Sequence, residues 1–588
     1  MDKTLLRTGK NTEYSHEHVG QKIVLNGWVN RRRDHGGVIF VDLRDVSGLI
    51  QLVFDPAYNE NAHKMADELR NEFVLAIKGT VFARSADAIN PNLATGKIEV
   101  FVDELTILSR AKALPFLLDE HHKVNEETRL KYRFLDLRRP AMQDNLIKRA
   151  KILKSARNFL DENDFLDVET PMLTKSTPEG ARDFLVPSRL AAGSFYALPQ
   201  SPQLFKQILM ISGLDRYYQI AKCFRDEDLR ADRQPEFTQI DIEFSFVDQE
   251  TILTTMEKMI GTIFKEVYGI EVKAPFKRIP YDEAMRRYGV DKPDLRFALE
   301  LVDVAAIAKK SEFKVFHQAL ESGGLVYALN AKGGAKFSRK EIDDYTNYVS
   351  IFGAKGLAWM KVTDKGLESS ITKFFSPEVL EELKKATDAK PGDIVFFGAD
   401  SPSVVHNALG NLRNKLAQDL GLIDPDRVEL AWVVDFPLLE WDDEEKRYVA
   451  LHHPFTSPCL EDMELLESEP LKVRSQAYDL VFNGVELGGG SIRIHSAQLQ
   501  QKMFELLGIS EEEAQIKFGF LIEALSYGAP PHGGIAFGLD RMVMLLQKMQ
   551  SIRDVIAFPK TQRGQCLLSN APSGVSERQL KELHIKTR

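Results

Sequence analysis

Residues 224–237 of this chain read Phe224-Arg225-Asp226-Glu227-Asp228-Leu229-Arg230-Ala231-Asp232-Arg233-Gln234-Pro235-Glu236-Phe237. The stretch is too charged for a hydrophobic core. Apolar, strand-like runs flank it at 217–224 and 237–244. Two strands joined by a loop of arginines and acids predict a hairpin that grips a polyanion, while the strands line a polar cleft. A nucleotide triphosphate is the first ligand to consider.

Composition excludes several classes of protein. At 588 residues, with 44% hydrophobic and 28% charged side chains, the chain predicts several globular domains. No uncharged apolar run approaches the ~20 residues of a membrane span, and the polar first 18 residues contain no signal segment. The scattered Cys223, Cys459 and Cys566 indicate structural thiols in a reducing cytosol, so we expect a cytoplasmic protein. With a net charge of -9, an RNA partner must be held by local basic patches.

The N-terminal part predicts a five-stranded barrel. Strand-like segments occupy 23–30, 38–44, 49–54, 73–83 and 98–108, and a helical segment near 62–69 separates the third from the fourth. This order is that of an OB-fold, which we assign to residues 1–109. Alternation places Phe40 on the outer face, near Arg31-Arg32-Arg33, where it predicts a platform for stacking bases. The alternative is a single exposed phenylalanine on a small barrel.

The rest of the chain divides by pattern. Residues 110–140 are charged and irregular and predict a hinge. A helix with apolar residues at 146, 150, 153, 156 and 160 then leads to a strand at 165–171 that Pro171 closes. We expect a catalytic domain in two parts, 141–288 and 422–558, interrupted by an inserted α/β domain at 289–421 and followed by a C-terminal extension at 559–588.

Two segments place polar side chains on one face. Ser201 and Pro202 predict the N-cap and first turn of a helix, on which Gln203, Lys206 and Gln207 share a face. Taken alone, this polar helix face is as compatible with exposure to solvent as with the lining of a binding site. After the charged loop, Gln239, Asp241 and Glu243 alternate with apolar residues, which is typical of a cleft lining and also of an ordinary half-exposed strand.

A second hairpin predicts a metal site. Asn483-Gly484 favours a two-residue turn that pairs Phe482 with Val485 and Val481 with Glu486. Asp479 and Glu486 then lie on one face as diagonal neighbours, and two carboxylates beside a triphosphate suit Mg²⁺. The alternative is a pair of surface acids.

The residues that follow this hairpin add two arginines. Gly488-Gly489-Gly490 precedes Arg493, which needs a bulge in the strand to reach the same face as Glu486. Near the C-terminus, 533–546 predicts a strand, a glycine turn and a helix whose first turn carries Arg541, a position suited to an anion.

The sequence motifs described above follow one another in the order found in a known enzyme family. Residues 165–171, 224–243 and 538–541 resemble motifs 1, 2 and 3 of the class II aminoacyl-tRNA synthetases, and almost the whole chain resembles the bacterial aspartyl-tRNA synthetase family, subclass IIb. The resemblance implies an α+β protein with a six- to seven-stranded antiparallel sheet flanked by helices, and a homodimer whose interface includes Pro171. It implies ATP-dependent activation of L-aspartate to aspartyl-adenylate, followed by transfer to tRNA(Asp).

The resemblance also implies residue roles. It implies that aspartate is bound by Glu179, Gln203, Lys206, Arg225, Asp241, His452 and Arg493. It assigns ATP to Arg225, Asp226, Glu227, Gln234, Glu486, Gly538, Leu539, Asp540 and Arg541. It assigns Mg²⁺ to Asp479 and Glu486, and the tRNA anticodon to Arg33, Phe40, Gln51, Arg84 and Glu99. Lys206 and Arg493 look like the cations that select aspartate over asparagine. The neutral amide of asparagine would leave their charge unpaired, and leaving a buried charge unpaired costs ~2–5 kcal/mol. The roles of Arg230 and Arg233 are left open: they either contact the acceptor end of the tRNA or form ion pairs within the protein.

Two barrel positions bear on tRNA choice. In the resembling family, leucine usually follows Arg-Arg-Arg-Asp in members restricted to tRNA(Asp), whereas members that also charge tRNA(Asn) tend to carry histidine, as His35 here. At a second position, members restricted to tRNA(Asp) commonly carry lysine, whereas this chain carries Asp87. We predict a non-discriminating enzyme. The alternatives are a surface histidine in a tRNA(Asp)-only enzyme, a lysyl- or asparaginyl-tRNA synthetase, an amide ligase using the same adenylation, and a non-catalytic RNA-binding paralogue.

Overall fold

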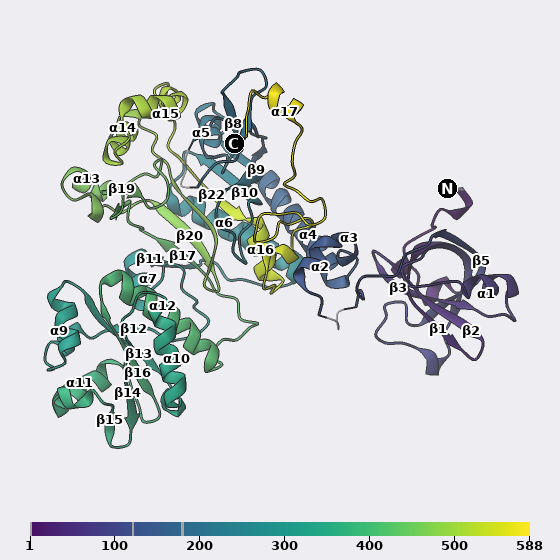
Figure 1. Ribbon diagram of the computed structural model, residues 1–588, viewed down its shortest axis with the longest axis horizontal. Helices are drawn as coiled ribbons and strands as arrows, with labels where there is room; N and C mark the ends of the chain where they lie inside the picture. Colours follow the sequence, from purple (N-terminus) through teal and green to yellow (C-terminus); the bar gives the residue numbers. More distant parts are fainter. Residues whose placement is uncertain (1–2, 120–122, 178–180, 588) are drawn as a thin grey trace. The chain divides into compact units, whose positions relative to one another are not determined.

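The computed structural model describes residues 3–119, 123–177 and 181–587 (Figure 1). The chain forms two compact units, residues 1–143 and 144–588. Within the described ranges, no helix is both long and apolar enough to cross a bilayer. Cys223, Cys459 and Cys566 form no disulfide among the residues described.

The first unit contains a closed barrel of strand order β1-β2-β3-β5-β4, which confirms the predicted OB-fold. Its elements are β1 Lys22–His35, β2 Val38–Asp45, β3 Gly48–Phe54, α1 Glu60–Ala66, β4 Val74–Ala83 and β5 Ile98–Ser109. Ile39, Val41 and Leu43 are fully buried inside the barrel, as alternation predicts. On the other face Arg44 is also buried, because it pairs with Glu72 at 2.8 Å.

The segment between the barrel and the second unit is more regular than its sequence suggests. The predicted hinge contains α2 Glu126–Lys131 and α3 Arg133–Asp136. The Asn125 side chain caps α2 by accepting from the Thr128 N–H, and the buried Arg133 and Asp136 pair at 2.6 Å. These caps and ion pairs order a charged segment that lacks an apolar period. The long helix α4 Pro140–Glu162 then begins.

The second unit is built on an eight-stranded sheet of order β11-β17-β20-β21-β22-β10-β9-β6. Its strands are β6 Leu166–Asp167, β9 Arg216–Phe224, β10 Glu236–Ser245, β11 Lys277–Pro280, β17 Leu430–Val434, β20 Ala477–Phe482, β21 Val485–Ile492 and β22 His532–Gly538. The pairs at both edges, β11 with β17 and β6 with β9, are parallel. The expectation of a six- to seven-stranded, wholly antiparallel sheet is therefore wrong at the edges. The strand predicted at 165–171 is only two residues long.

Helices cover the sheet and leave a cleft. Helices α4, α6 Gln249–Ile263 and α16 Leu539–Leu546 share its main hydrophobic core, which includes Ile152, Met256 and Met542. Leu204 of α5 Gln203–Ile211 packs in a separate cluster with Phe504 and Phe518 of α14 Ala497–Leu506 and α15 Glu511–Leu525. The short strands β7 Leu185–Pro187 with β8 Phe195–Ala197, and β18 Leu439–Asp442 with β19 Arg447–Ala450, form two small sheets.

The predicted insertion contains its own five-stranded sheet of order β12-β13-β16-β14-β15. Its elements are β12 Leu301–Asp303, α8 Ala305–Ala308, α9 Lys314–Glu321, β13 Leu325–Ala331, α10 Arg339–Ser350, β14 Ala358–Thr363, β15 Gly366–Glu368, α11 Pro377–Ala386, β16 Ile394–Asp400 and α12 Pro402–Asp419. Its two hydrophobic clusters are separate from the core of the large sheet. The fully buried Arg413 of α12 fixes the linking segment by donating to the carbonyls of Asp294 and Leu299.

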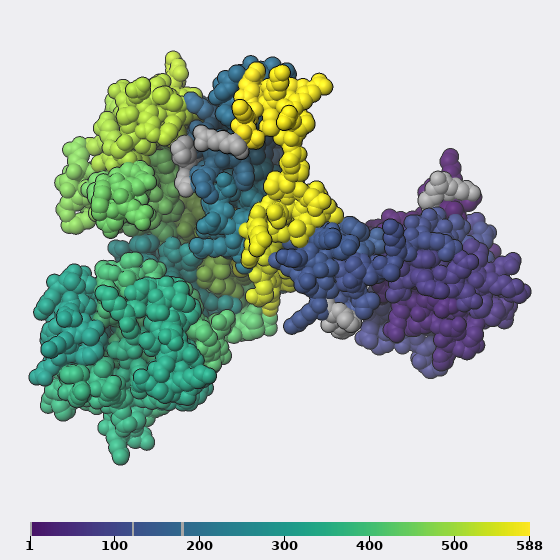
Figure 2. Space-filling view, in the orientation of Figure 1, coloured from purple at the N-terminus to yellow at the C-terminus, as the bar shows by residue number. Residues whose placement is uncertain are grey.

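The C-terminal extension crosses the surface of the second unit, where Figure 2 shows it in yellow, and includes α17 Glu577–Glu582. It begins against the charged loop. The backbone N–H of Lys560 donates to the Gln234 side chain at 2.7 Å, and the Lys560 ammonium pairs with Glu236. The extension thereby supports the loop that the sequence singles out.

Candidate active site

A cavity of about 530 Å³ opens over the middle of the large sheet. Most of the predicted aspartate, ATP and metal residues line it: Gln203, Lys206, Arg225, Glu227, Gln234, Asp241, His452, Asp479, Glu486, Arg493, Gly538, Asp540 and Arg541. Leu539 is fully buried in the core instead, and Asp226 is exposed and bridges to Arg182. Glu179 lies outside the described residues.

Lys206 is buried rather than solvated. Pro202, not Ser201, is the N-cap of α5, and the Ser201 hydroxyl accepts from the Gln203 N–H at 3.3 Å. Helical spacing then turns Lys206 inward, where it is 2% exposed and its ammonium lies 2.7 Å from Asp241 Oδ1. The solvent-exposed alternative is therefore wrong for this face. A lysine at this depth must be held by opposite charge.

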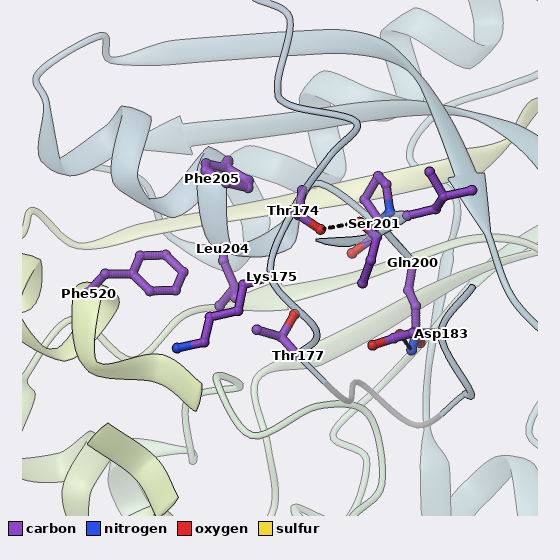
Figure 3. Close-up of a pocket in the computed structure, with 12 residues that line it drawn as sticks. Thr174, Lys175, Thr177, Asp183, Gln200, Ser201, Leu204, Phe205 and Phe520 are labelled. Atoms are coloured by element: carbon purple, nitrogen blue, oxygen red, sulfur yellow. Dashed lines mark hydrogen bonds between the residues drawn. The ribbon is translucent and has the colours of Figure 1, made fainter. Parts of the chain in front are cut away.

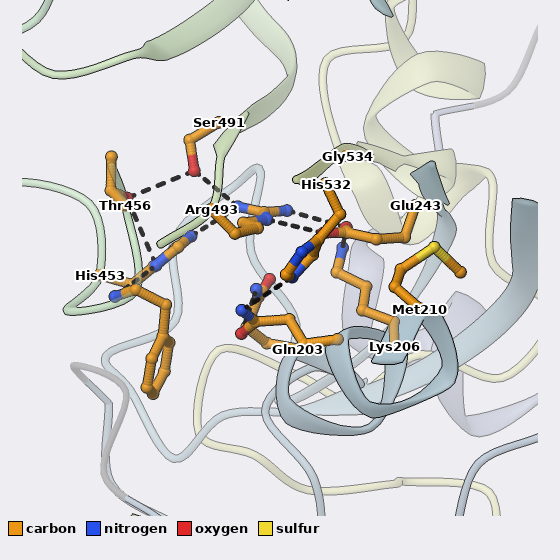
Figure 4. Close-up of polar contacts among 12 residues, drawn as sticks. Gln203, Lys206, Met210, Glu243, His453, Thr456, Ser491, Arg493, His532 and Gly534 are labelled. Carbon is orange, nitrogen blue, oxygen red and sulfur yellow. Dashed lines mark hydrogen bonds and ion pairs between the residues drawn. The ribbon is translucent and has the colours of Figure 1, made fainter. Parts of the chain in front are cut away.

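Glu243 connects two cations and is the main residue that the predicted site omits. Arg493 donates to both of its carboxylate oxygens, at 2.9 and 3.1 Å, and the Lys206 ammonium lies 3.3 Å away (Figure 4). Glu243 of β10 is fully buried, with Arg493 and Lys206 against its carboxylate. A Cβ added to the facing Gly534 would lie 2.0 Å from Glu243 Oε2, so that glycine makes room for the carboxylate. The alternation at 239–243 is the sequence signal that could have found Glu243.

The cluster shifts the pKa values of its acids in opposite directions. Burial raises the pKa of Asp241, and the charge of Lys206 only partly offsets it. Burial also acts upward on Glu243, but the charges of Arg493 and Lys206 outweigh it, so the pKa of Glu243 is lowered. Glu243 is thus the firmly ionised member that holds both cations.

His453 fixes the outer side of Arg493. The Arg493 Nη1 donates to His453 Nε2 at 2.8 Å and to Ser491 Oγ at 2.7 Å. Because arginine only donates, Nε2 is the acceptor in its contact with Arg493, and the other ring nitrogen, Nδ1, lies 3.2 Å from the Phe455 N–H and 3.3 Å from Thr456 Oγ1. Removal from water and the Arg493 charge lower the pKa of His453 well below its usual value, in keeping with a neutral ring.

A bulge aligns the two sides of the site. The predicted pairs Val481–Glu486 and Phe482–Val485 are present, but Leu480 pairs with Gly488, so Leu487 is an extra residue. The bulge that the sequence requires therefore exists, one residue before the glycine run. It reverses the alternation and brings Glu486 to the face that carries Gly489, Ser491 and Arg493.

Asp479 and Glu486 face each other across Gly489. A Cβ on Gly489 would meet Asp479 Oδ1 at 2.4 Å and Glu486 Oε1 at 3.7 Å. Burial and the neighbouring Asp479 raise the pKa of Glu486. Within the described ranges, no set of three or more histidine, cysteine or carboxylate side chains is arranged to hold a metal. Two carboxylates match the donor set of Mg²⁺, which takes its remaining ligands from phosphate and water.

His452 belongs to the carboxylate side of the cleft. Its Nε2 lies 3.8 Å from Asp479 Oδ1, and its ring packs edge-on against Phe436. Burial acts downward on the pKa of His452, but Asp479 and Glu486 outweigh it and the pKa is raised. The adjacent histidines therefore differ: the pKa of His452 is raised beside two acids, and the pKa of His453 is lowered beside an arginine.

Two arginines present unused donors to the cleft. The Arg225 guanidinium lies 5.1 Å above the Phe237 ring, and its Nε has no hydrogen-bond partner among the described residues. Arg541 donates through Nη1 to the Glu486 carbonyl at 3.1 Å, and its buried Nε likewise lacks a partner within the described part of the chain. Both groups are suited to an anionic ligand.

Other predicted ATP residues are engaged with protein groups. Glu227 pairs with Arg233 at 2.7 Å, so Arg233 makes an internal ion pair in this structure. The Gln234 side-chain amide donates to the Lys560 carbonyl and accepts from the Lys560 N–H. Asp540 binds Arg149 and accepts from the Thr238 N–H at 2.7 Å, so it joins α16 to β10.

The predicted anticodon residues form one surface of the barrel. Arg33 donates to Asp42 at 2.6 Å and to Gln51 at 3.3 Å, and Gln51 donates to Glu99 at 2.9 Å. Arg84 lies 4.0 Å from Glu99. Half-buried Phe40 lies opposite Arg33 in the β1–β2 pairing.

The two positions that bear on tRNA choice are exposed. His35 ends β1 beside the Gly36-Gly37 turn, where both glycines have positive φ. Asp87 lies in a short 3-10 helix between β4 and β5.

A second cavity, of about 250 Å³, lies between residues 174–177 with Asp183, the start of α5 and Phe520 of α15 (Figure 3). It shares only Ser201 with the lining of the larger cleft and contains none of the predicted site residues. Lys175 and Asp183 are the charged residues of its lining, which otherwise combines polar and apolar side chains.

Two known families match the chain. Residues 125–562 match the tRNA synthetases class II (D, K and N), and residues 23–108 match the OB-fold nucleic acid binding domain.

Relatives match along nearly the full length. "Aspartate--tRNA(Asp/Asn) ligase" of Geotalea uraniireducens is 60% identical and covers 97% of this chain and 96% of its own length. The protein of the same name from Heliobacterium modesticaldum is 58% identical, covering 99% and 96%. Among solved structures, asparaginyl-tRNA synthetase of Pyrococcus horikoshii with asparaginyl-adenylate has a TM-score of 0.59 at 18% identity, covering 94% and 98%. A putative aspartyl-tRNA synthetase of Leishmania major has a TM-score of 0.58 at 19% identity, covering 92% of each chain. At these identities the structures bear on the fold alone.

Proposed function

This chain belongs to the class II tRNA synthetases (D, K and N), and on that premise we propose that it is a non-discriminating aspartate–tRNA ligase. It activates L-aspartate with ATP and transfers it to tRNA(Asp) and tRNA(Asn). The observation that carries the proposal is the buried pair of cations, Lys206 and Arg493, at the wall of the cleft. A lysine-specific pocket would need acids there.

The chemistry requires positioning rather than a protein nucleophile. An oxygen of the aspartate α-carboxylate attacks the α-phosphorus of ATP, and pyrophosphate leaves. A ribose hydroxyl at the tRNA 3′ end then attacks the carbonyl of the adenylate, and AMP leaves. Arg225 neutralises charge where carboxylate and α-phosphate meet, and Arg541 binds the far end of the triphosphate.

Selection against asparagine follows from the fixed cations. Lys206 and Arg493 receive the side-chain carboxylate of aspartate, whereas a neutral amide leaves their charge less well compensated. Asp241 and Gln203 orient the substrate from the same wall, and Glu243 and His453 keep Arg493 in place. The discrimination expected of such a site is ~2–5 kcal/mol, or roughly 30- to 5,000-fold.

Asp479 and Glu486 are proposed to hold Mg²⁺, which would supply charge neutralisation to the phosphates when bound. The support is their approach over Gly489 and the raised pKa of Glu486, which burial and the neighbouring Asp479 cause. Arg541 contacts the same strand, which places cation and carboxylates at one end of the cleft.

The barrel is proposed to read the anticodon through Arg33, Phe40, Gln51, Arg84 and Glu99. Exposed His35 and Asp87 permit tRNA(Asn) as well as tRNA(Asp), and the relatives' printed names support this breadth.

We also propose a cytoplasmic homodimer. Leu166, Met172 and Leu173, beside Pro171, are large apolar side chains exposed in the single chain, and a partner copy would cover them. Sedimentation of the protein and of Leu173→Glu tests this: a monomeric wild type would contradict the dimer.

Aminoacylation of tRNA(Asp) and tRNA(Asn) transcripts with radioactive aspartate tests the ligase proposal. We expect both to be charged, with aspartate-dependent ATP–pyrophosphate exchange in the absence of tRNA. Charging of tRNA(Asp) alone would contradict the broad specificity and favour the tRNA(Asp)-only alternative. Faster exchange with asparagine or lysine than with aspartate would overturn the substrate assignment.

A further inference from the structure

Three aromatic side chains form a cluster on the outside of the barrel, apart from the anticodon residues named above. Tyr58 precedes α1, Phe82 lies near the end of β4 and Phe101 lies in β5. The ring centroids of Phe82 and Phe101 are 4.7 Å apart, and that of Tyr58 is 5.3 Å from Phe101 and 6.2 Å from Phe82. Tyr58 is 41% exposed and Phe82 is 39% exposed.

The cluster is held rigidly. The Tyr58 hydroxyl donates to Asp103 Oδ1 at 2.8 Å, and the neighbouring Asn59 side chain donates to the Asp103 carbonyl at 2.8 Å. The tyrosine ring is thereby fixed against Phe101 before any ligand arrives. Because little side-chain freedom remains to be lost, such a platform binds at low entropic cost.

The cluster is continuous with the proposed anticodon surface. Phe82 lies opposite Glu99 in the β4–β5 pairing, and Arg84, two residues later, has an Nη2 without a hydrogen-bond partner among the described residues. On the other side, Phe101 lies opposite Val53, which in turn lies opposite Phe40. The aromatic rings and the polar anticodon residues thus follow one another across adjacent strands.

We propose that Tyr58, Phe82 and Phe101 form a stacking site for an unpaired base of the tRNA anticodon loop outside the anticodon triplet. This inference rests on the proposed ligase function. A base fits because every base has a π face and stacks on exposed aromatic rings. A protein partner fits less well, because a stable protein interface needs about 1,000 Å² or more, far beyond two partly exposed rings.

Filter binding of a tRNA(Asp) transcript to the full-length enzyme at fixed salt tests the proposal. Phe82→Ala should raise the Kd roughly 5- to 150-fold, as expected for the loss of one stacked base. Phe82→Leu keeps an apolar contact with Phe101 but loses the ring face and should also weaken binding, whereas Phe82→Tyr should bind like wild type. Aspartate-dependent pyrophosphate exchange without tRNA should be the same in all three variants, because the barrel takes no part in it.

Transcripts with single abasic sites in the anticodon loop identify the base. At one position outside the triplet, removal of the base should abolish the difference between wild type and Phe82→Ala. Phe40→Ala separates this inference from the proposed function. Normal binding by Phe82→Ala and Phe82→Leu, together with weak binding by Phe40→Ala, would overturn the stacking site and leave the ligase proposal standing. If the wild type does not bind the tRNA(Asp) transcript, the ligase proposal falls and the stacking site with it.

Discussion

Glu243 holds Arg493 through both of its carboxylate oxygens and at the same time approaches Lys206. The two cations that distinguish aspartate from asparagine in the proposed reaction are therefore positioned by one buried acid. This arrangement also brings together β10, β21 and α5, which are far apart in the sequence.

Glu243→Gln should impair both stability and aspartate activation. It keeps the size of the side chain but leaves Arg493 and Lys206 with one fewer compensating charge, and breaking a buried pair costs about 3–5 kcal/mol. Urea unfolding should show the loss, and pyrophosphate exchange should show a higher KM for aspartate. Glu440→Gln, at an exposed position of β18, is the matched control. An unchanged unfolding midpoint would contradict the role given to Glu243.

Arg493→Lys should reduce the preference for aspartate over asparagine. One ammonium cannot satisfy Glu243, His453 and Ser491 as the planar guanidinium does, so the retained charge is misplaced. The ratio of kcat/KM values for the two amino acids in pyrophosphate exchange measures this, and we expect a drop of at least about tenfold, or ~1.4 kcal/mol. Arg447→Lys on exposed β19 serves as the control. A preserved ratio would argue against Arg493 as a selecting cation.

Gly489→Ala should alter the magnesium dependence. The added methyl would meet Asp479 Oδ1 at 2.4 Å and so push the two carboxylates out of their arrangement. We expect a higher Mg²⁺ concentration for half-maximal pyrophosphate exchange. Gly356→Ala provides the control, because a Cβ there meets nothing within 4 Å. Identical Mg²⁺ titrations of Gly489→Ala and wild type would refute the proposed metal site.

The lowered pKa of His453 predicts a loss of stability on the acid side. Well above a pH of about 6.5 the ring is neutral in both native and unfolded chains. As the pH falls below that value, the unfolded chain binds the proton first, so the free energy of unfolding decreases until the native pKa is reached. Each unit by which the native pKa is lowered corresponds to about 1.4 kcal/mol.

Unfolding of wild type and His453→Gln between pH 7 and 5 measures this contribution. The variant should lose less stability over the range, and its KM for aspartate should rise less at low pH, because no proton can disturb Arg493. His16→Gln, at an exposed position, is the control. Parallel stability profiles for wild type and His453→Gln would contradict a neutral buried His453.

Local patterns were sufficient for much of the fold. The alternation of Ile39, Val41 and Leu43 predicts the inward face of the barrel, and the Asn483-Gly484 turn predicts the pairing of Val481 with Glu486. Such features depend on neighbours in sequence. The parallel edge pairs and the helices of the predicted hinge do not, because they depend on distant strands, caps and ion pairs.

The sequence by itself determined the residue types of the site and their order: arginines in the charged loop, two acids on a hairpin, and an arginine that begins a helix. Only the tertiary structure decided their environments. Lys206 is indistinguishable from a solvated lysine until α5 packs beside β10, and Glu243 becomes a fully buried acid only when the fold brings Lys206 and Arg493 against it. The reason is physical, since a charge is defined by its spacing along the chain but its pKa and its partners depend on which other charges share its low-dielectric surroundings.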